Sequence, residues 1–399
     1  MLRFLTIFGM VCLYSGLAQS APFIPAGDSV VLERLPFKVN DPVYRELSGL
    51  RGELSREPNN LKLAVTLAQR YFDLALAEGD PRFIGYAEAA LAPWWTLPRS
   101  ATAPPTEVLV LRATLRQYTH DFASALADLE LAIGREPDNG AAWSLRAAIY
   151  LVQADYAAAL QACERLRGSA SPLIVVACKS TVDALTGKAA AAYAALQKIY
   201  AASTAAPVVE KRWALTRLAE IADRMGRAVD ADAHFKTALA LTQQSGGKDA
   251  YLLAAYAEFL LDANRPQEVL TLLKGAERSD VLLVRLALAE KALNLPSAAT
   301  HQAAIAARFD AARLRGDKLH IQEESRFYLY FLQNAKEALR LAQENWQSQR
   351  EPSDARMLLE AALAAQDKAA TLPVLKWLQE SGNEDVYLQR LKQQAEALR

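Results

Sequence analysis

Apolar residues recur along the chain at helical spacing, and the pattern repeats itself after 34 residues. When the segment from Thr106 is aligned with the segment from Gly140, apolar positions coincide and polar positions vary. Such self-similarity predicts a repeat architecture, in which each unit buries its apolar face against its neighbours. The matched pairs are Leu109 with Trp143, Leu111 with Leu145, Ala113 with Ala147, Leu115 with Ile149, Phe122 with Tyr156, Ala125 with Ala159, Leu126 with Leu160 and Leu129 with Cys163.

Each period predicts two amphipathic helices joined by a short turn. In the first copy the turn is at His120, and the second helix runs from Phe122 to Gly134. Pro137 then ends the unit, because proline disfavours helical geometry in the residue before it. Weaker copies of the pattern extend from about Asn59 to Leu378, which predicts eight full repeats and part of a ninth.

The 34-residue period resembles the tetratricopeptide repeat. The closing proline of that family is matched by Pro137 and its early tryptophan by Trp143. Its small residues are matched in the first helices by Ala113, Ala147 and Ala219, and in the second helices by Ala125, Ala159 and Ala231. The resemblance, which includes a general likeness to secreted bacterial members, implies an all-α fold: an open, right-handed α-solenoid of antiparallel helix pairs. It also implies a protein-binding role, with the first helix of each pair lining a concave groove.

The first twenty residues predict a secretory signal peptide. Arg3 is their lone charge, an apolar run follows from Phe4 to about Leu13, and small residues precede a cleavage site near Ser20. A single membrane anchor is the alternative, but the apolar run is shorter than the roughly 20 residues that a spanning helix needs. We therefore expect a secreted or periplasmic protein with no integral membrane segment after signal removal.

The chain is expected to divide into four parts with one internal loop. These are the signal peptide (1–20), an extended lead with a first helix (21–58), the repeat array (59–380) with a proline-rich loop at 93–105, and a C-terminal capping helix (381–399). Trp94 and Trp95 lie in that loop and either form a contact site or attach the loop to the solenoid. We favour attachment.

Signal removal takes Cys12 away and leaves Cys163 and Cys178. An even pair in an oxidising compartment is a disulfide candidate. The alternative is two small, buried, apolar side chains. Because the two cysteines lie on predicted antiparallel helices joined by one turn, their thiols could meet.

Composition and motifs point away from nucleic acid and from catalysis. Lys+Arg and Asp+Glu both total 45, so no net charge favours nucleic acid or an anionic membrane. The four histidines lack zinc-ligand spacing, and His320 with Glu323 and Glu324 is explained as well by an intrahelical ion pair. Gly246-Gly247 lacks the spacing of a phosphate loop. We expect no enzyme activity, no metal and no cofactor.

The concave groove is where function is expected. Aromatic anchors and acids on it would suit a basic and apolar partner segment. The candidate partner-binding residues are Trp213, Glu220, Asp223, Tyr251 and Glu258, with Gln117 and Ser144 nearer the N-terminus. The expected function is a non-enzymatic protein-binding scaffold or assembly factor of the cell envelope or secreted space, with a protein or peptide partner. The alternatives are a structural subunit of an envelope complex and a helical-toroid enzyme acting on polysaccharide, with Glu220 and Asp223 as its carboxylates.

Overall fold

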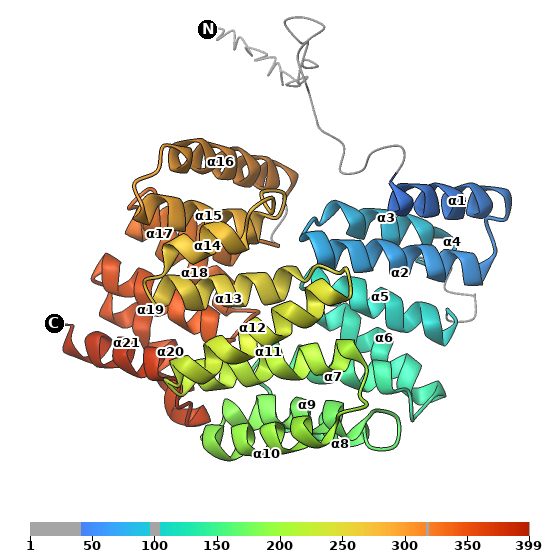
Figure 1. Ribbon diagram of the computed structural model, residues 1–399, viewed down its shortest axis with the longest axis horizontal. Coiled ribbons are helices and arrows are strands. Elements are labelled where there is room, and N and C mark those ends of the chain that lie inside the picture. The colour runs from blue at the N-terminus through green and yellow to red at the C-terminus, as the bar shows by residue number, and fades with distance from the viewer. Residues whose placement is uncertain (1–40, 96–103, 317–318, 399) are drawn as a thin grey trace, which may run out of the picture. The chain divides into compact units, whose positions relative to one another are not determined.

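A computed structural model describes residues 41–95, 104–316 and 319–398 (Figure 1). The expected signal peptide, the extended lead up to residue 40 and the middle of the proline-rich loop lie outside the described residues. Two units are distinguished, one ending at Gly49 and a much larger one beginning at Leu50. Helix α1 (Pro42–Arg56), which corresponds to the expected first helix, contains the boundary between them.

The larger unit is a series of helix pairs, and its described residues contain no β-strand. A four-residue helix, α4 (Ala92–Trp95), follows the first pair, and α21 (Val386–Ala397) follows the last. The nine pairs are α2 (Leu61–Glu78) with α3 (Arg82–Ala90), α5 (Thr106–Tyr118) with α6 (Phe122–Arg135), α7 (Gly140–Val152) with α8 (Tyr156–Arg165), α9 (Pro172–Ala184) with α10 (Ala189–Ala202), α11 (Val208–Arg224) with α12 (Ala228–Gln244), α13 (Ala250–Asp262) with α14 (Pro266–Leu272), α15 (Asp280–Ala292) with α16 (Ser297–Arg315), α17 (Ile321–Tyr330) with α18 (Ala335–Trp346), and α19 (Pro352–Ala365) with α20 (Lys368–Ser381). The predicted all-α solenoid of antiparallel helix pairs is confirmed.

The turn inside each pair follows one rule. In all nine pairs, one turn residue adopts a positive φ, which reverses the chain within a few residues. Glycine takes this conformation without strain, and Asn, His and Gln take it at some cost. The nine residues are Gly79, His120, Ala154, Gly187, Gly226, Asn264, Asn294, Gln333 and Gln366. Short polar side chains then begin several second helices: Asp121 accepts from Ser124 N, and Asp155 accepts from Ala158 N.

The core lies between the two helices of each pair and between neighbouring pairs. Small side chains occupy the crossing points, so that the helix backbones approach closely. Ala113, Ala125, Ala219 and Ala231 are fully buried there. One large apolar cluster runs from α9 to α17 and another from α18 to α21, while smaller clusters join α5 to α9. The predicted alanine positions thus pack as the repeat pattern implies.

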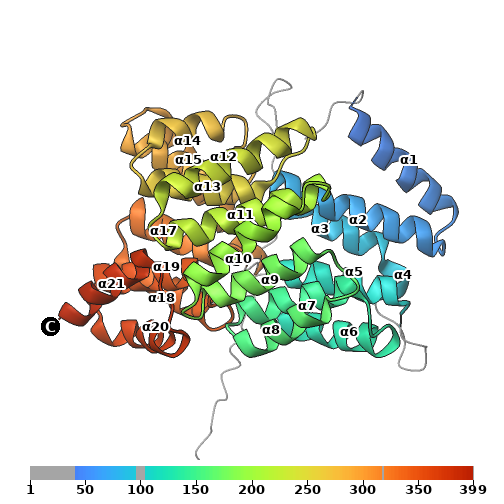
Figure 2. The ribbon, with the colours of Figure 1, turned by 60° about the horizontal axis from the view of Figure 1, so that its bottom comes forward.

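The early and late repeats also contact one another at their turns. Gln349 Nε2 lies 3.2 Å from His120 Nδ1, and Arg350 N donates to Val152 O over 2.8 Å. Ala189 N, at the start of α10, donates to Glu384 Oε2 over 2.9 Å. Figures 1 and 2 both show α20 and α21 beside α10 and α11.

The first pair makes similar contacts with the middle of the chain. Lys248 Nζ lies 3.0 Å from Glu78 Oε1. Gly79 lies so close to Ser279 that a Cβ at this position would collide with the serine side chain. The sequence predicts an open superhelix. The structure is less open than this prediction, because these contacts join turns that lie about 200 residues apart along the chain.

Candidate partner-binding site

The predicted groove residues lie on the first helices of their pairs, and two of them meet. Tyr251, at the start of α13, donates from its hydroxyl to Glu220 Oε1 on α11 over 2.5 Å. The guanidinium of Arg217 lies 4.8 Å from the Tyr251 ring centre and pairs with Glu220 Oε2 at 3.1 Å. Tyr251 is 54% exposed. The aromatic anchor is therefore accessible, but the acid beside it already has a cation.

Glu258, two helical turns further along α13 than Tyr251, is fully engaged by arginines. Its carboxylate lies 2.7 Å from Arg326 Nη1, 3.1 Å from Arg285 Nε and 3.3 Å from Arg356 Nη1. Glu323 on α17 completes the group, 2.8 Å from Arg285 Nη1. Burial alone would raise the pKa of Glu258, but the three guanidiniums outweigh it and hold that pKa below its ordinary value.

The same network continues into α19 and α21. Arg356 forms a two-pronged contact with Asp262, at 2.6 and 2.7 Å, and pairs with Glu360 at 3.0 Å. It also lies over the ring of Tyr387 at 4.1 Å. We call the ion pairs among Glu258, Asp262, Arg285, Glu323, Arg326, Arg356 and Glu360 the arginine–glutamate network. It joins four successive first helices, α13, α15, α17 and α19.

Asp223 behaves differently from the other predicted acids. It lies at the end of α11, and the structure gives it carboxylate neighbours in Asp262 and Asp385. Burial and then these two neighbours raise the pKa of Asp223 to about 6, against the opposing effect of Arg224 and Arg356. A cationic group from a partner would relieve this repulsion.

The remaining predicted residues lie apart from this group. Trp213, near the start of α11, is half-buried against the large apolar cluster. Gln117 is half-buried on α5, and Ser144 is exposed on α7. That any of the predicted residues binds a partner stays a prediction. The arginines were missed, although spacings such as Arg217 with Glu220 already signal a helical ion pair.

The described part of the chain also contains a cavity of about 490 Å³ away from the predicted groove. It lies over α13, between α12 and α14, and the end of α2 and the Lys274–Arg278 turn contribute to its walls. Sequence patterns gave no sign of it beyond the short apolar run of α14. Its size is typical of ligand and peptide pockets.

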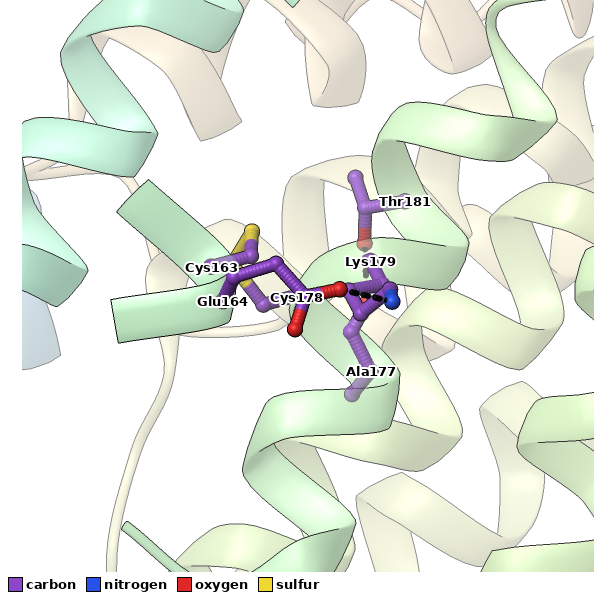
Figure 3. The surroundings of a disulfide bond; sticks show 6 residues. All are labelled: Cys163, Glu164, Ala177, Cys178, Lys179 and Thr181. Carbon is purple, nitrogen blue, oxygen red and sulfur yellow. Dashed lines mark hydrogen bonds and ion pairs between the residues drawn. A yellow bond between two sulfur atoms is a disulfide. The ribbon is translucent and has the colours of Figure 1, made fainter. Parts of the chain in front are cut away.

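Two further sequence expectations concern the proline-rich loop and the cysteines. Trp95 is held by Arg112, whose Nη1 donates to Trp95 O over 2.6 Å, and by Arg116, whose guanidinium lies 5.6 Å from the ring centre. Attachment of the loop's first residues is thus confirmed. Cys163 on α8 and Cys178 on α9 are joined as a disulfide, with Cα atoms 5.7 Å apart (Figure 3). An ion pair between Glu164 and Lys179 lies beside it.

The described residues contain no group of three or more His, Cys, Asp and Glu side chains that could hold a metal ion. Glu323 and Glu324 pair with Arg285 and Arg313 of other helices, so the expected intrahelical pair with His320 is not the explanation of that cluster. No described helix is long and apolar enough to cross a membrane.

Comparisons with known proteins add a fold-level likeness only. No protein-family model matches the chain, and a search of the curated proteins gave no match. Among solved structures, the chain is similar to a crystal structure of the P58(IPK) TPR domain, at 16% identity over 73% of this chain and 98% of that one. The TM-score is 0.25, so this likeness carries no argument. The helix pairs themselves establish an all-α solenoid.

Proposed function

We propose that this chain is a non-enzymatic scaffold that binds a protein or peptide partner outside the cytoplasm. Solenoids of stacked helix pairs commonly offer extended surfaces to other proteins. The observation that carries the proposal is the contact between α11 and α13, where the exposed ring of Tyr251 lies among Arg217 and Glu220. We call the surface from this contact to Glu258 the inner face. An accessible aromatic ring framed by charges is typical of interface anchors.

The location outside the cytoplasm rests on two supports. One is the signal-like sequence before Ser20. The other is the Cys163–Cys178 disulfide, since such bonds persist chiefly in oxidising compartments. We expect the native protein to begin at Ala21 and to show no free thiol when it is denatured without reductant. A native mass that retains residues 1–20, or two free thiols, would contradict this location.

The binding proposal is tested by recovering partners from a native extract. Mature wild-type protein and the Tyr251→Ala variant are immobilised, chemically cross-linked to bound proteins, and compared. Tyr86→Ala is the matched control, because Tyr86 on α3 is also 54% exposed. Removal of the anchor at Tyr251 should abolish recovery of the wild-type partners, whereas the control should keep them.

Equal recovery by the wild type and both variants would show that this face is not the binding site. Thermal unfolding of each variant, measured first, establishes that a lost partner reflects the surface and not the fold.

A further inference from the structure

The cavity between α12 and α14 results from helix length. Helix α14 is seven residues long, whereas its neighbouring second helices α12 and α16 have 17 and 19 residues. The last turns of α12 therefore extend beyond the end of α14. Leu239, Thr242 and Gln243, which line the cavity, lie on those turns. The empty space is where about two more turns of α14 would pack.

The floor of the cavity is apolar. Leu252, Tyr256 and Leu260 of α13 are buried beneath it, and Leu282 closes its far end. Three further leucines, at 239, 253 and 272, line it while remaining half-exposed. Half-exposed leucines on three different helices around one hollow are what a missing helix would leave uncovered.

The charges at the rim favour an acidic occupant. Each of its acids already has a cation: Glu78 has Lys248, Asp249 has Arg212, and Glu268 has Arg265. Four cations line the cavity, namely Lys236, Lys248, Lys274 and Arg278. Lys274 is exposed and forms no ion pair with another described residue. The lining has four cations and three acids. Lys236 already pairs with Asp232 and Lys248 with Glu78, which leaves the exposed Lys274 as the lysine available to an acidic group.

We propose that the cavity binds an acidic amphipathic helix of another protein, which supplies the turns that α14 lacks. The apolar face of that helix covers Leu239, Leu253 and Leu272, and an Asp or Glu side chain on its flank faces Lys274. Helix-in-groove docking of this kind places apolar anchors at helical spacing. The inference rests on the proposed protein-binding function and adds a second site, separate from Tyr251, with its own partner chemistry.

The test is a selection from a displayed library of helical peptides against the mature full-length protein. Peptides of about twelve residues are used, because shorter helices are marginal in water. Positions on one face are fixed as Leu, and the flanks vary freely among acidic, basic and neutral residues. We expect the enriched peptides to carry Asp or Glu on at least one flank and to bind more weakly as salt rises.

Two variants and their matched controls locate the binding. Gln243→Trp fills the mouth of the cavity and should weaken an enriched, labelled peptide roughly tenfold or more in fluorescence anisotropy. Gln244→Trp, at the next and also exposed position but outside the lining, should not. Lys274→Glu should weaken binding about fivefold. Lys198→Glu, an exposed reversal on α10, should leave binding unchanged.

Several outcomes would overturn the proposal. These are no enrichment, enrichment of peptides with no acidic flank, and equal binding by the Gln243→Trp variant. Displacement of the peptide by dansyl-undecanoic acid, with tighter binding of that probe than of the peptide, would identify a lipid site instead. The Tyr251→Ala protein retains the cavity, so its capture of the peptide separates this proposal from the fate of the inner-face site.

Discussion

The inner face around Glu258 and the cavity beside α14 differ in what their side chains leave available to a partner. At Glu258, three arginines from α15, α17 and α19 contact one carboxylate, so these charges pair with one another. At the cavity, three half-buried leucines pack against the apolar core and keep part of their surface beside the hollow where α14 ends at Leu272. The first region links four first helices by ion pairs. The second leaves apolar surface for something else to cover.

The difference shows that a predicted concave position is not by itself a binding position. Side chains of successive first helices face one another as well as a ligand, and charges that pair within the chain are unavailable to a partner. Breaking such a pair is costly, since removal of one member leaves the other charge buried without a partner. Opportunity for binding arises where the repeat pattern is interrupted.

The largest expected effect tests the closed region. Glu258→Gln leaves Arg326, which is buried, without its main counter-charge, so we expect a loss of about 3–5 kcal/mol in the free energy of unfolding. Chemical denaturation measures it. Glu130→Gln, at an exposed position on α6, is the control and should change stability by no more than about 0.5 kcal/mol. Similar small losses in both variants would mean that the arginine–glutamate network does not hold the repeats together.

The stability contributed by the disulfide can be compared with that contributed by the ion pairs of Glu258. Replacing both Cys163 and Cys178 by Ala opens a link between residues 15 apart and should cost about 3 kcal/mol. The same loss should follow addition of reductant to the wild type, while the double variant should be insensitive to reductant. Thermal unfolding with and without dithiothreitol distinguishes these cases. A wild type indifferent to reductant would contradict the expected contribution of the bond.

A smaller and pH-dependent effect is expected at Asp223. Its pKa in the folded protein is raised to about 6 from an ordinary value of 3.8, so the folded state holds the proton more tightly than the unfolded state. Stability is therefore lost as pH rises from about 4 through 6. Asp223→Asn should be more stable than the wild type by roughly 1–2 kcal/mol at pH 7.5, after allowance for solvent screening. This advantage should disappear near pH 4 in denaturation series at both pH values. An advantage of the same size at both would show that the carboxylate does not titrate as described.

The smallest effect on stability is expected at the cavity. Leu239→Gln exchanges a half-exposed apolar side chain for a polar one, so unfolding should change by less than about 1 kcal/mol. Binding of the apolar dye ANS should nonetheless fall, because the uncovered surface shrinks. A large loss of stability would show that Leu239 belongs to the core, and the contrast with Glu258 would fail.

The helix pairs could be predicted from sequence because each is a local pattern. The expected second helix Phe122–Gly134 lacks only the last residue of α6, and the expected turn at His120 is where the chain reverses. Repeat count came close, with nine pairs in the described residues against eight and part of a ninth. Local periodicity and turn chemistry contain this information.

The site was less accessible to prediction, because its contacts join distant repeats. Glu258 pairs with Arg326, 68 residues away, and no spacing rule signals such a contact. The sequence analysis identified the acids of the groove but not their arginine partners on other first helices. The cavity depends on where α14 ends, and helix ends are the least certain feature of a sequence pattern.

The contacts between early and late turns change how the solenoid holds together. In a linear array each repeat contacts only its neighbours, so the end units can fray without consequence for the distant ones. Here Glu384 binds the start of α10 and Gln349 contacts His120, so the C-terminal repeats support helices far upstream. Loss of the last helices removes partners from the α9–α10 turn as well as from their own neighbours. The contacts therefore link the two ends of the array, and we expect it to unfold as one unit rather than from its ends.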